Sequence, residues 1–323
     1  MKNNTKKMKV LVFGAGVLGS LYAARLKDDG QDVTVVARGK RYRDILEHGI
    51  VLEEFLTREQ KVTSVRVVDQ MPADEFFDVC LVLVQKTQLT NALPVLATNP
   101  LIPTFVFMVN TAEGPTEMID VLGRDRVVLG FSNAGGERDG HVVRLMEAKG
   151  KAITLGELNG VKTERLDRLS NAFRSAGFPV ETSRNMDAWL RYHVAMIAPW
   201  ANGFYMAGGC NYRMARNREA VKKALLAMRE GVAVVRAHGF PYEPRVIRWF
   251  LALPDFVLVR LMQKVLASPI MDIGGKRHAM AARDEMTELN EELLELAERA
   301  GMETPMMREL HRYSDPAVAP AYT

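Results

Sequence analysis

The chain is poor in cysteine and has no long apolar run. Its 323 residues include two cysteines, Cys80 and Cys210, far apart in the sequence, so the pattern favours a reduced compartment over a disulfide framework. No apolar run reaches the ~20 residues that a membrane-spanning helix needs. The lysine-rich residues 1–9 are followed by an apolar run that stops at a glycine after four residues. This run is too short for the apolar part of a signal peptide. We therefore expect a cytoplasmic protein without a membrane partner.

Metal-ligand patterns and a strong net charge are also missing. The six histidines show no metal-ligand spacing with one another or with a cysteine, so no metal site is expected. The net charge of +4 suits small anionic ligands but is too diffuse to indicate nucleic-acid binding. The content of 48% hydrophobic and 25% charged residues is that of an ordinary globular protein, and the chain is long enough for two domains.

A glycine-rich turn near the N-terminus organises the rest of the sequence. Residues 10–13 read VLVF, which is typical of a strand buried on both faces, and a helix-forming segment starts at residue 20. Residues 14–19 between them match G-x-G-x-x-G. The first glycine of such a turn allows a tight bend, the second lets the backbone approach a pyrophosphate, and the third lets the helix pack closely. The predicted cofactor-binding residues of this turn are Gly14, Ala15, Gly16, Val17, Leu18 and Gly19.

The end of the second predicted strand indicates which dinucleotide binds. This strand covers residues 33–37, and an NAD-binding unit carries an Asp or Glu at its end, ~20 residues past the glycines, for the ribose 2′-hydroxyl. Here residues 38–43 contain four cations and no carboxylate. Because Arg38 can grip a 2′-phosphate with two hydrogen bonds, the sequence favours NADP(H) over NAD. The alternative is a solvated basic loop.

Further apolar runs at residues 78–84, 104–109 and 127–130 alternate with helical segments. This order predicts a doubly wound parallel sheet, that is, a Rossmann-type α/β domain. Ligands of such sheets lie beyond the carboxyl ends of the strands. The polar residues that follow two of these strands, and are therefore also predicted to bind the cofactor, are Lys86, Gln88 and Asn110. We expect a hairpin or extra strands of the nucleotide-binding domain within residues 50–69, and antiparallel strands within residues 133–157 that close the sheet.

Strand patterns nearly disappear after residue 161, so the second half of the chain is predicted to be helical. The boundary is expected near residue 182, which gives an NADP-binding domain over residues 1–182 and a helical substrate or dimerisation domain over residues 183–323. The apolar residues 249–254 belong either to the core or to a homodimer contact. The predicted helices cover residues 163–177, 187–208, 217–238, 243–267 and 279–300.

Together these motifs resemble the ketopantoate reductase (2-dehydropantoate 2-reductase) family over nearly the whole chain. The resemblance implies a Rossmann-type NADP domain followed by an all-helical domain, with the substrate in the cleft between them. It also implies reduction of a 2-oxo acid by hydride transfer from NADPH, which in pantothenate biosynthesis converts 2-dehydropantoate to pantoate. The motifs are GAGVLG and VVARG after the first two strands, QKTQ at 85–88, Asn110 with Gly114, LGE at 155–157, WLRYH at 189–193, and Glu285, Asn290, Gly301, Thr304 and Pro305.

The substrate side departs from the family pattern. Arg191 stands where the family has a general-acid lysine, and Ala195 and Ala198 replace two asparagines that hold the substrate. Arginine gives up a proton poorly but can stabilise a developing alkoxide. The resemblance therefore implies two catalytic residues: Arg191, which stabilises the carbonyl oxygen, and Glu285, which positions substrate or water. The residues implied to bind the substrate are Asn110, Arg191 and Asn290.

Two other functions stay open at this point. One is a dehydrogenase that oxidises another hydroxy acid or an opine-type substrate, which the missing asparagines favour. The other is a non-catalytic NADP-binding sensor, which the missing lysine favours. Residues 268–278 do not align with the family pattern, and the sequence does not choose between 2-dehydropantoate and a related substrate.

Overall fold

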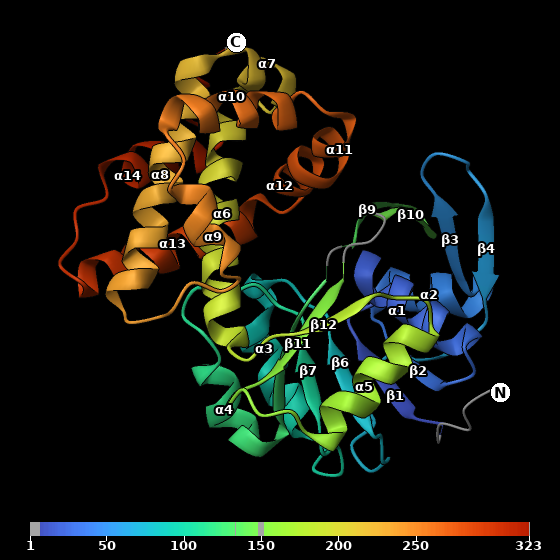
Figure 1. The fold of residues 1–323 in the computed structure, drawn as a ribbon. Coiled ribbons are helices and arrows are strands. Elements are labelled where there is room, and N and C mark those ends of the chain that lie inside the picture. The colour runs from blue at the N-terminus through green and yellow to red at the C-terminus, as the bar shows by residue number, and fades with distance from the viewer. Residues whose placement is uncertain (1–6, 133, 148–151, 323) are drawn as a thin grey trace. The chain divides into compact units, whose positions relative to one another are not determined.

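The computed structural model describes residues 7–132, 134–147 and 152–322 (Figure 1). The chain divides into two compact units. The first comprises the residues up to Val109 together with Pro115–Met186, and the second comprises Asn110–Gly114 together with the residues from Asp187 onwards. The expected boundary near residue 182 lies a few residues before this division. The division also groups the short segment Asn110–Gly114 with the helical unit.

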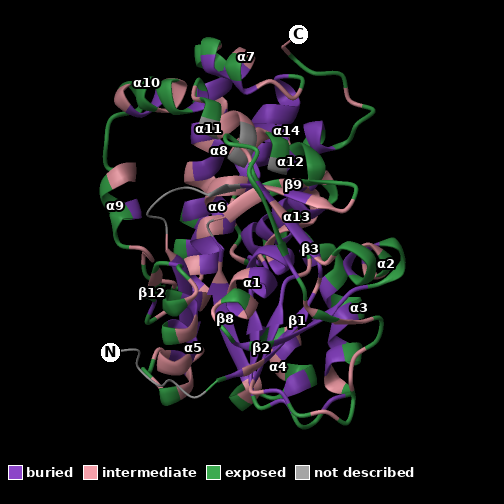
Figure 2. Ribbon diagram, turned by 90° about the vertical axis from the view of Figure 1, so that its right-hand side faces the viewer, coloured by how far each residue is buried: buried purple, intermediate pink, exposed green. Residues whose placement is uncertain are grey.

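An eight-stranded sheet forms the centre of the first unit. Its strand pairs are parallel, apart from β8 with β11. The apolar runs read from the sequence form its central strands, and Figure 2 shows β1, β2 and β8 coloured as buried. The strands in spatial order are β12 (Val180–Thr182), β11 (Ile153–Glu157), β8 (Val127–Phe131), β7 (Phe105–Phe107), β6 (Val79–Val82), β1 (Lys9–Phe13), β2 (Asp32–Val36) and β5 (Arg66–Val68).

The order of the strands reverses at β1. Strand β2 pairs with one edge of β1 and β6 with the other, and both pairings are parallel. The carboxyl end of β1 therefore opens onto the crevice where such sheets bind ligands. The α/β fold class predicted from the sequence is confirmed. The helices of this unit are α1 (Val17–Asp28), α2 (Gly39–His48), α3 (Lys86–Ala97), α4 (Thr116–Leu122) and α5 (Glu164–Ser175), with a short 3-10 turn η1 (Arg124–Arg126).

A second, four-stranded sheet corrects one expectation. Of the strands expected within residues 133–157 to close the main sheet, only β11 does so, and residues 133 and 148–151 lie outside the described residues. The other two strands of this segment, β9 and β10, pair with each other. Strand β10 also pairs with β3, which forms a hairpin with β4. All four strands contact α1. Alternating apolar residues show that one face of a strand is buried, but not what covers it. The strands in order are β4 (Gln60–Thr63), β3 (Ile50–Glu54), β10 (Val142–Glu147) and β9 (Ala134–Asp139).

The second unit is helical, as predicted, with two differences in the bounds. The helix expected over residues 243–267 is two helices with Pro254 between them, because proline lacks an N–H group and disfavours a helical residue before it. The helix expected over 279–300 is α13, which begins at Arg283. No described helix is long and apolar enough to span a bilayer. The helices are α6 (Met186–Met206), α7 (Asn211–Arg216), α8 (Arg218–Ala237), α9 (Val246–Leu251), α10 (Asp255–Leu266), α11 (Pro269–Met271), η2 (Asp272–Arg277), α12 (His278–Ala281), α13 (Arg283–Arg299), α14 (Pro305–His311) and η3 (Arg312–Ser314).

The apolar residues 249–254 are largely at the surface of the second unit. Trp249 is 70% exposed and Leu253 is 39% exposed, while Phe250 and Leu251 are half-buried. The prediction of a core position is therefore wrong for Trp249 and Leu253. A homodimer contact through this stretch stays a prediction.

The first turn of α1 lies directly on the loop that precedes it. A Cβ on residue 19 would be 1.8 Å from the carbonyl oxygen of Gly14, and a Cβ on residue 14 would be 2.4 Å from the carbonyl oxygen of Leu83. Gly14 also has a φ of +106°, a conformation that glycine adopts readily. At Gly16, in contrast, an added Cβ would meet nothing within 4 Å. The tight turn at Gly14 and the close helix packing at Gly19 are thus confirmed.

Gly19→Ala is expected to lower the free energy of unfolding by about 2 kcal/mol or more, because its methyl group must displace backbone atoms. Gly16→Ala is the matched control. Because alanine is a poorer N-cap residue than glycine, we expect it to cost at most about 1 kcal/mol. Urea unfolding of both variants measures the difference. Equal stabilities would contradict the packing of α1 on the glycine loop.

Candidate active site

The glycine loop offers a phosphate-binding surface at the carboxyl end of β1. Gly16 is the N-cap residue of α1, and no side chain caps this helix. The N–H groups of the first helical turn therefore lack helical partners, and together with the helix dipole they favour an anion. Because the side of Gly16 where a Cβ would project is open, the loop fits the pyrophosphate of a dinucleotide. Contact with a cofactor stays a prediction for residues 14–19.

Basic residues follow β2, as the sequence predicts. Arg38 is exposed and stands at the N-cap of α2. The first acidic residue of α2, Asp44, is engaged by Lys40 at 2.9 Å, and this hydrogen bond lowers the pKa of Asp44. Arg38 has no ion pair among the described residues, so its guanidinium is available to an anion such as a 2′-phosphate.

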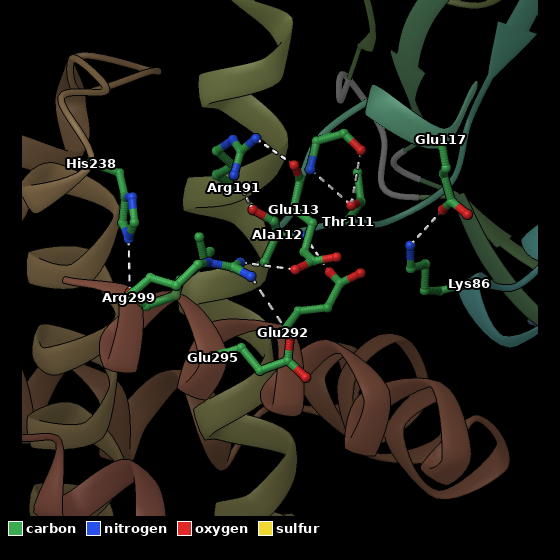
Figure 3. Close-up of polar contacts among 12 residues, drawn as sticks. Lys86, Thr111, Ala112, Glu113, Glu117, Arg191, His238, Glu292, Glu295 and Arg299 are labelled. Atoms are coloured by element: carbon green, nitrogen blue, oxygen red, sulfur yellow. Dashed lines mark hydrogen bonds and ion pairs between the residues drawn. The ribbon is translucent and has the colours of Figure 1, made fainter. Parts of the chain in front are cut away.

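Lys86 and Gln88 lie in the first turn of α3, directly after the strand β6. Lys86 is buried, and its Nζ is 2.7 Å from Oε1 of Glu117 on α4 (Figure 3). The charge of this lysine is thus balanced within the first unit. Gln88 is exposed. A role for either residue in cofactor binding stays a prediction.

In the second unit, Arg191 of α6 clamps the segment Asn110–Gly114. Its guanidinium donates hydrogen bonds to the carbonyl oxygens of Ala112 and Glu113, the second at 2.6 Å (Figure 3). A third hydrogen bond runs from Nε to Oδ1 of Asp187, one helical turn earlier, at 2.8 Å. Three donors of a buried arginine are therefore committed to this segment and to its own helix.

Gly114 is required for this clamp. It has a φ of +85°, and a Cβ on it would lie 2.2 Å from Nη2 of Arg191. The N–H of Gly114 also donates to Oγ1 of Thr111 at 3.1 Å, which closes the segment into a compact turn. The Asn-x-x-x-Gly pattern read from the sequence thus ends on a glycine that the geometry demands.

The helix α13 holds the same segment through two further contacts. The N–H of Ala112 donates to Oε2 of the buried Glu292 at 2.6 Å, and the carboxylate of Glu113 pairs with Arg299 at 2.8 Å (Figure 3). No hydrogen bond of the Asn110 side chain occurs among the described residues. The segment therefore has a fixed backbone and an Asn110 amide that is available to a ligand.

Glu285 and Asn290 lie on different sides of α13. Glu285 is buried and shares a side with Glu292, which follows two helical turns later. Asn290, five residues after Glu285, is on another side. It is fully buried, and neither atom of its amide has a hydrogen-bond partner among the described residues. The structure thus brings Glu285, and not Asn290, to the side of α13 that bonds the Asn110–Gly114 segment.

The two alanines that replace the family's asparagines belong to the core of the second unit. Ala195 and Ala198 are fully buried. Helix α8 comes close to this part of α6 at Gly231, where a Cβ would lie 3.3 Å from the carbonyl oxygen of Ala195. A small side chain at position 195 therefore agrees with tight packing of α6 against α8.

Sequence reasoning did not single out three residues of the clamp, which are Asp187, Phe240 and Glu292. The guanidinium of Arg191 lies over the ring of Phe240, 4.3 Å from its centre. Asp187 precedes Arg191 by one helical turn, a spacing that predicts an ion pair, so this signal was present. Glu292 carried no such signal, since its partner is a backbone N–H far away in the sequence. No cluster of three metal-ligating side chains occurs in the part of the chain that the structure describes.

Comparison with known proteins agrees with this geometry. Residues 10–160 match the family described as Ketopantoate reductase PanE/ApbA. Over these residues, a little less than half of the chain, the protein resembles the ketopantoate reductase family. The family match covers the glycine loop, the basic end of β2 and the whole Asn110–Gly114 segment, and therefore the features on which the cofactor prediction depends.

The relatives are distant in sequence. A 2-dehydropantoate 2-reductase of Pyrococcus abyssi is 22% identical over 93% of this chain and 94% of its own length. One of Pyrococcus horikoshii is 25% identical, but the match spans only 56% of this chain and 58% of that protein. Among solved structures, a ketopantoate reductase from Ralstonia eutropha JMP134 has a TM-score of 0.75 at 22% identity, covering 95% and 97% of the two chains. A D-mandelate dehydrogenase bound to NADH and anilino(oxo)acetate has a TM-score of 0.78 at 14% identity, covering 96% and 97%. These structural likenesses establish the fold.

Arg191→Met is expected to lower the free energy of unfolding by about 2 kcal/mol, because the buried carbonyl group of Ala112 loses its donor. Arg299→Gln, which removes an exposed ion pair to the same segment, is the control and should cost less than about 1 kcal/mol. Urea unfolding gives the two values. Hydrogen exchange at residues 111–114 should accelerate in Arg191→Met, and unchanged exchange would contradict the clamp.

Proposed function

We propose that the protein reduces the ketone of a 2-oxo acid with NADPH, the substrate being 2-dehydropantoate or a related acid. The observation that carries the proposal is the glycine loop at the carboxyl end of β1, with its open Gly16, its uncapped helix and Arg38 after β2. These features are what a dinucleotide with an additional phosphate needs. Resemblance to a family that includes 2-dehydropantoate 2-reductases supports the choice of reaction.

The residues of the first unit would hold the cofactor. The N–H groups at the start of α1 would bind the pyrophosphate, and Arg38 would bind the 2′-phosphate with two charge-assisted hydrogen bonds. When bound, NADPH supplies the hydride that reduces the carbonyl carbon. The remaining task of the chain is to orient the 2-oxo acid and to stabilise negative charge on its carbonyl oxygen.

The residues of the second unit would orient the substrate. Asn110 is the candidate for a direct contact, because its amide is available on a segment held by Arg191 and Glu292. The family resemblance implies that Arg191 stabilises the carbonyl oxygen, whereas its three committed donors favour a positioning role that acts through Asn110. Glu285 would position substrate or water from α13.

A panel of 2-oxo acids tests the reaction directly. We expect at least one of them, 2-dehydropantoate included, to cause loss of the NADPH absorbance in the presence of the protein. Asn110→Ala should lower kcat/KM at least about tenfold while the Kd for NADPH changes little, because a hydrogen bond at the reacting carbonyl is lost. Absence of turnover with every acid of the panel would count against a reductase.

The preference for NADPH depends on Arg38. Arg38→Gln is expected to raise the KM for NADPH at least about tenfold and to leave the KM for NADH unchanged, since only NADPH carries the 2′-phosphate. Arg43→Gln, which removes an exposed cation of the same basic segment, is the control and should behave like the wild type. An unaltered ratio of the two constants in Arg38→Gln would assign the phosphate to other residues.

Oxidation of a 2-hydroxy acid is the second candidate. It is favoured by the likeness in fold to D-mandelate dehydrogenase, whose structures contain NADH. The same site would then serve the reverse reaction. A screen of 2-hydroxy acids with NADP and with NAD decides, because a dehydrogenase should show a higher kcat/KM in this direction than for any 2-oxo acid.

A further inference from the structure

A buried arginine lies beneath the glycine loop without a carboxylate partner. Arg41, in the first turn of α2, is 7% exposed. It donates from Nε to the carbonyl oxygen of Ala15 at 3.0 Å, from Nη2 to Oγ of Ser20 at 2.8 Å, and from Nη1 to the carbonyl oxygen of His141 at 3.0 Å. All three acceptors are neutral. Among the described residues, no acid lies within ion-pair distance of Arg41.

The bond to Ala15 sets the orientation of the loop. A peptide unit is planar, and its C=O and N–H point in opposite directions. When Arg41 holds the carbonyl group of Ala15, the N–H of Gly16 must therefore point away from Arg41. The N–H of Gly16 is then directed away from the protein, and Gly16 is the glycine of the loop that faces open space. Through His141, the same arginine also ties the loop to the turn between β9 and β10.

A second arginine faces the same place from the second sheet. In β9, Gly136 lies against α1, since a Cβ on it would be 3.1 Å from Cγ1 of Val17. Side chains two residues apart share a face of a strand, so Arg138 is on the same face as Gly136. It is paired in register with Val143, which is fully buried, and is itself exposed.

The acids of β9 do not neutralise Arg138. Glu137 and Asp139 lie on the opposite face, where Arg144 engages them at 3.9 Å and 3.0 Å. Arg138 has no ion pair among the described residues. The pKa of the Arg41 guanidinium is lowered by burial first and by the charge of Arg138 second, while Asp44 acts in the opposite direction to a smaller extent.

Three positive features thus converge on the start of α1: the helix N-terminus, Arg41 and Arg138. Like charges that approach one another are unfavourable, and an anion bound there reduces the repulsion. We propose that Arg138 is a phosphate-binding residue of the dinucleotide site, and that Arg41 is the positioning residue that orients the glycine loop beside it. The inference rests on the dinucleotide binding of the proposed function and adds a ligand from the second sheet.

Titration of the full-length protein with NADPH and with NADH, followed by nicotinamide fluorescence, tests both residues without any turnover. Arg138→Gln should raise the Kd at least about tenfold, because a charge-assisted hydrogen bond is lost. A loss for NADPH alone assigns Arg138 to the 2′-phosphate, and an equal loss for both nucleotides assigns it to the pyrophosphate. The control is Arg43→Gln, which removes the same charge from an exposed residue on the opposite side of α2 from Arg41. This variant should bind both nucleotides like the wild type.

Arg41→Lys keeps the charge but not the three directed donors. We expect it to raise the Kd for both nucleotides at least about tenfold, with the circular dichroism spectrum unchanged. Wild-type affinity in Arg138→Gln for both nucleotides overturns the proposed ligand, and wild-type affinity in Arg41→Lys overturns the positioning role. If the wild type binds neither nucleotide, the proposed function itself fails.

Discussion

Only a hydrogen atom fits on the Cα of residue 19, because the carbonyl oxygen of Gly14 occupies the space of a side chain. This contact places the start of α1 directly over the end of β1, and much of the first unit follows from it. Helix α1 packs against two strands of the main sheet, β1 and β2. All four strands of the second sheet also contact this helix. The free N–H groups of its first turn are thereby held at the point where the strand order reverses.

A comparable constraint acts in the second unit. The segment Asn110–Gly114 is closed into a turn by the bond between Gly114 and Thr111. It is held from outside by Arg191, Glu292 and Arg299. Such a segment loses conformational freedom when the protein folds, not when a ligand binds. An Asn110 amide on a fixed backbone can then orient a substrate at little further entropic cost. Under the proposed function, Arg191 would therefore act by positioning this segment and not by giving up a proton.

The main elements of the fold were predictable because they have long or strongly apolar patterns. The runs at β1, β6 and β7 and the helices α6 and α8 are of this kind, and the GAGVLG turn has a strict steric requirement. The separate sheet of β3, β4, β9 and β10 was not predictable, since strand alternation does not identify the partner. Short elements such as β12 and α14 contain too few residues for a period to show.

The candidate site divides in the same way. The close steric contacts of Gly14 and Gly19 depend on local geometry and were predictable from spacing alone, whereas the approach of a pyrophosphate to Gly16 stays a prediction. Arg191 was also found, but its bonds to the backbone of residues 112 and 113 depend on contacts nearly eighty residues away in the sequence, as the separations of 79 and 78 show. Arg41 and Glu292 were missed for the same reason, because each bonds to a backbone atom that no sequence pattern marks.

The transfer of an isotope label tests the central claim most directly. NADPH that carries deuterium at the transferable position of nicotinamide C4 is incubated with the protein and a 2-oxo acid, and the product is examined by mass spectrometry. The account predicts a 2-hydroxy acid with one deuterium on its C2 carbon. Tight binding of NADPH with no deuterium in the product of any 2-oxo acid would contradict it.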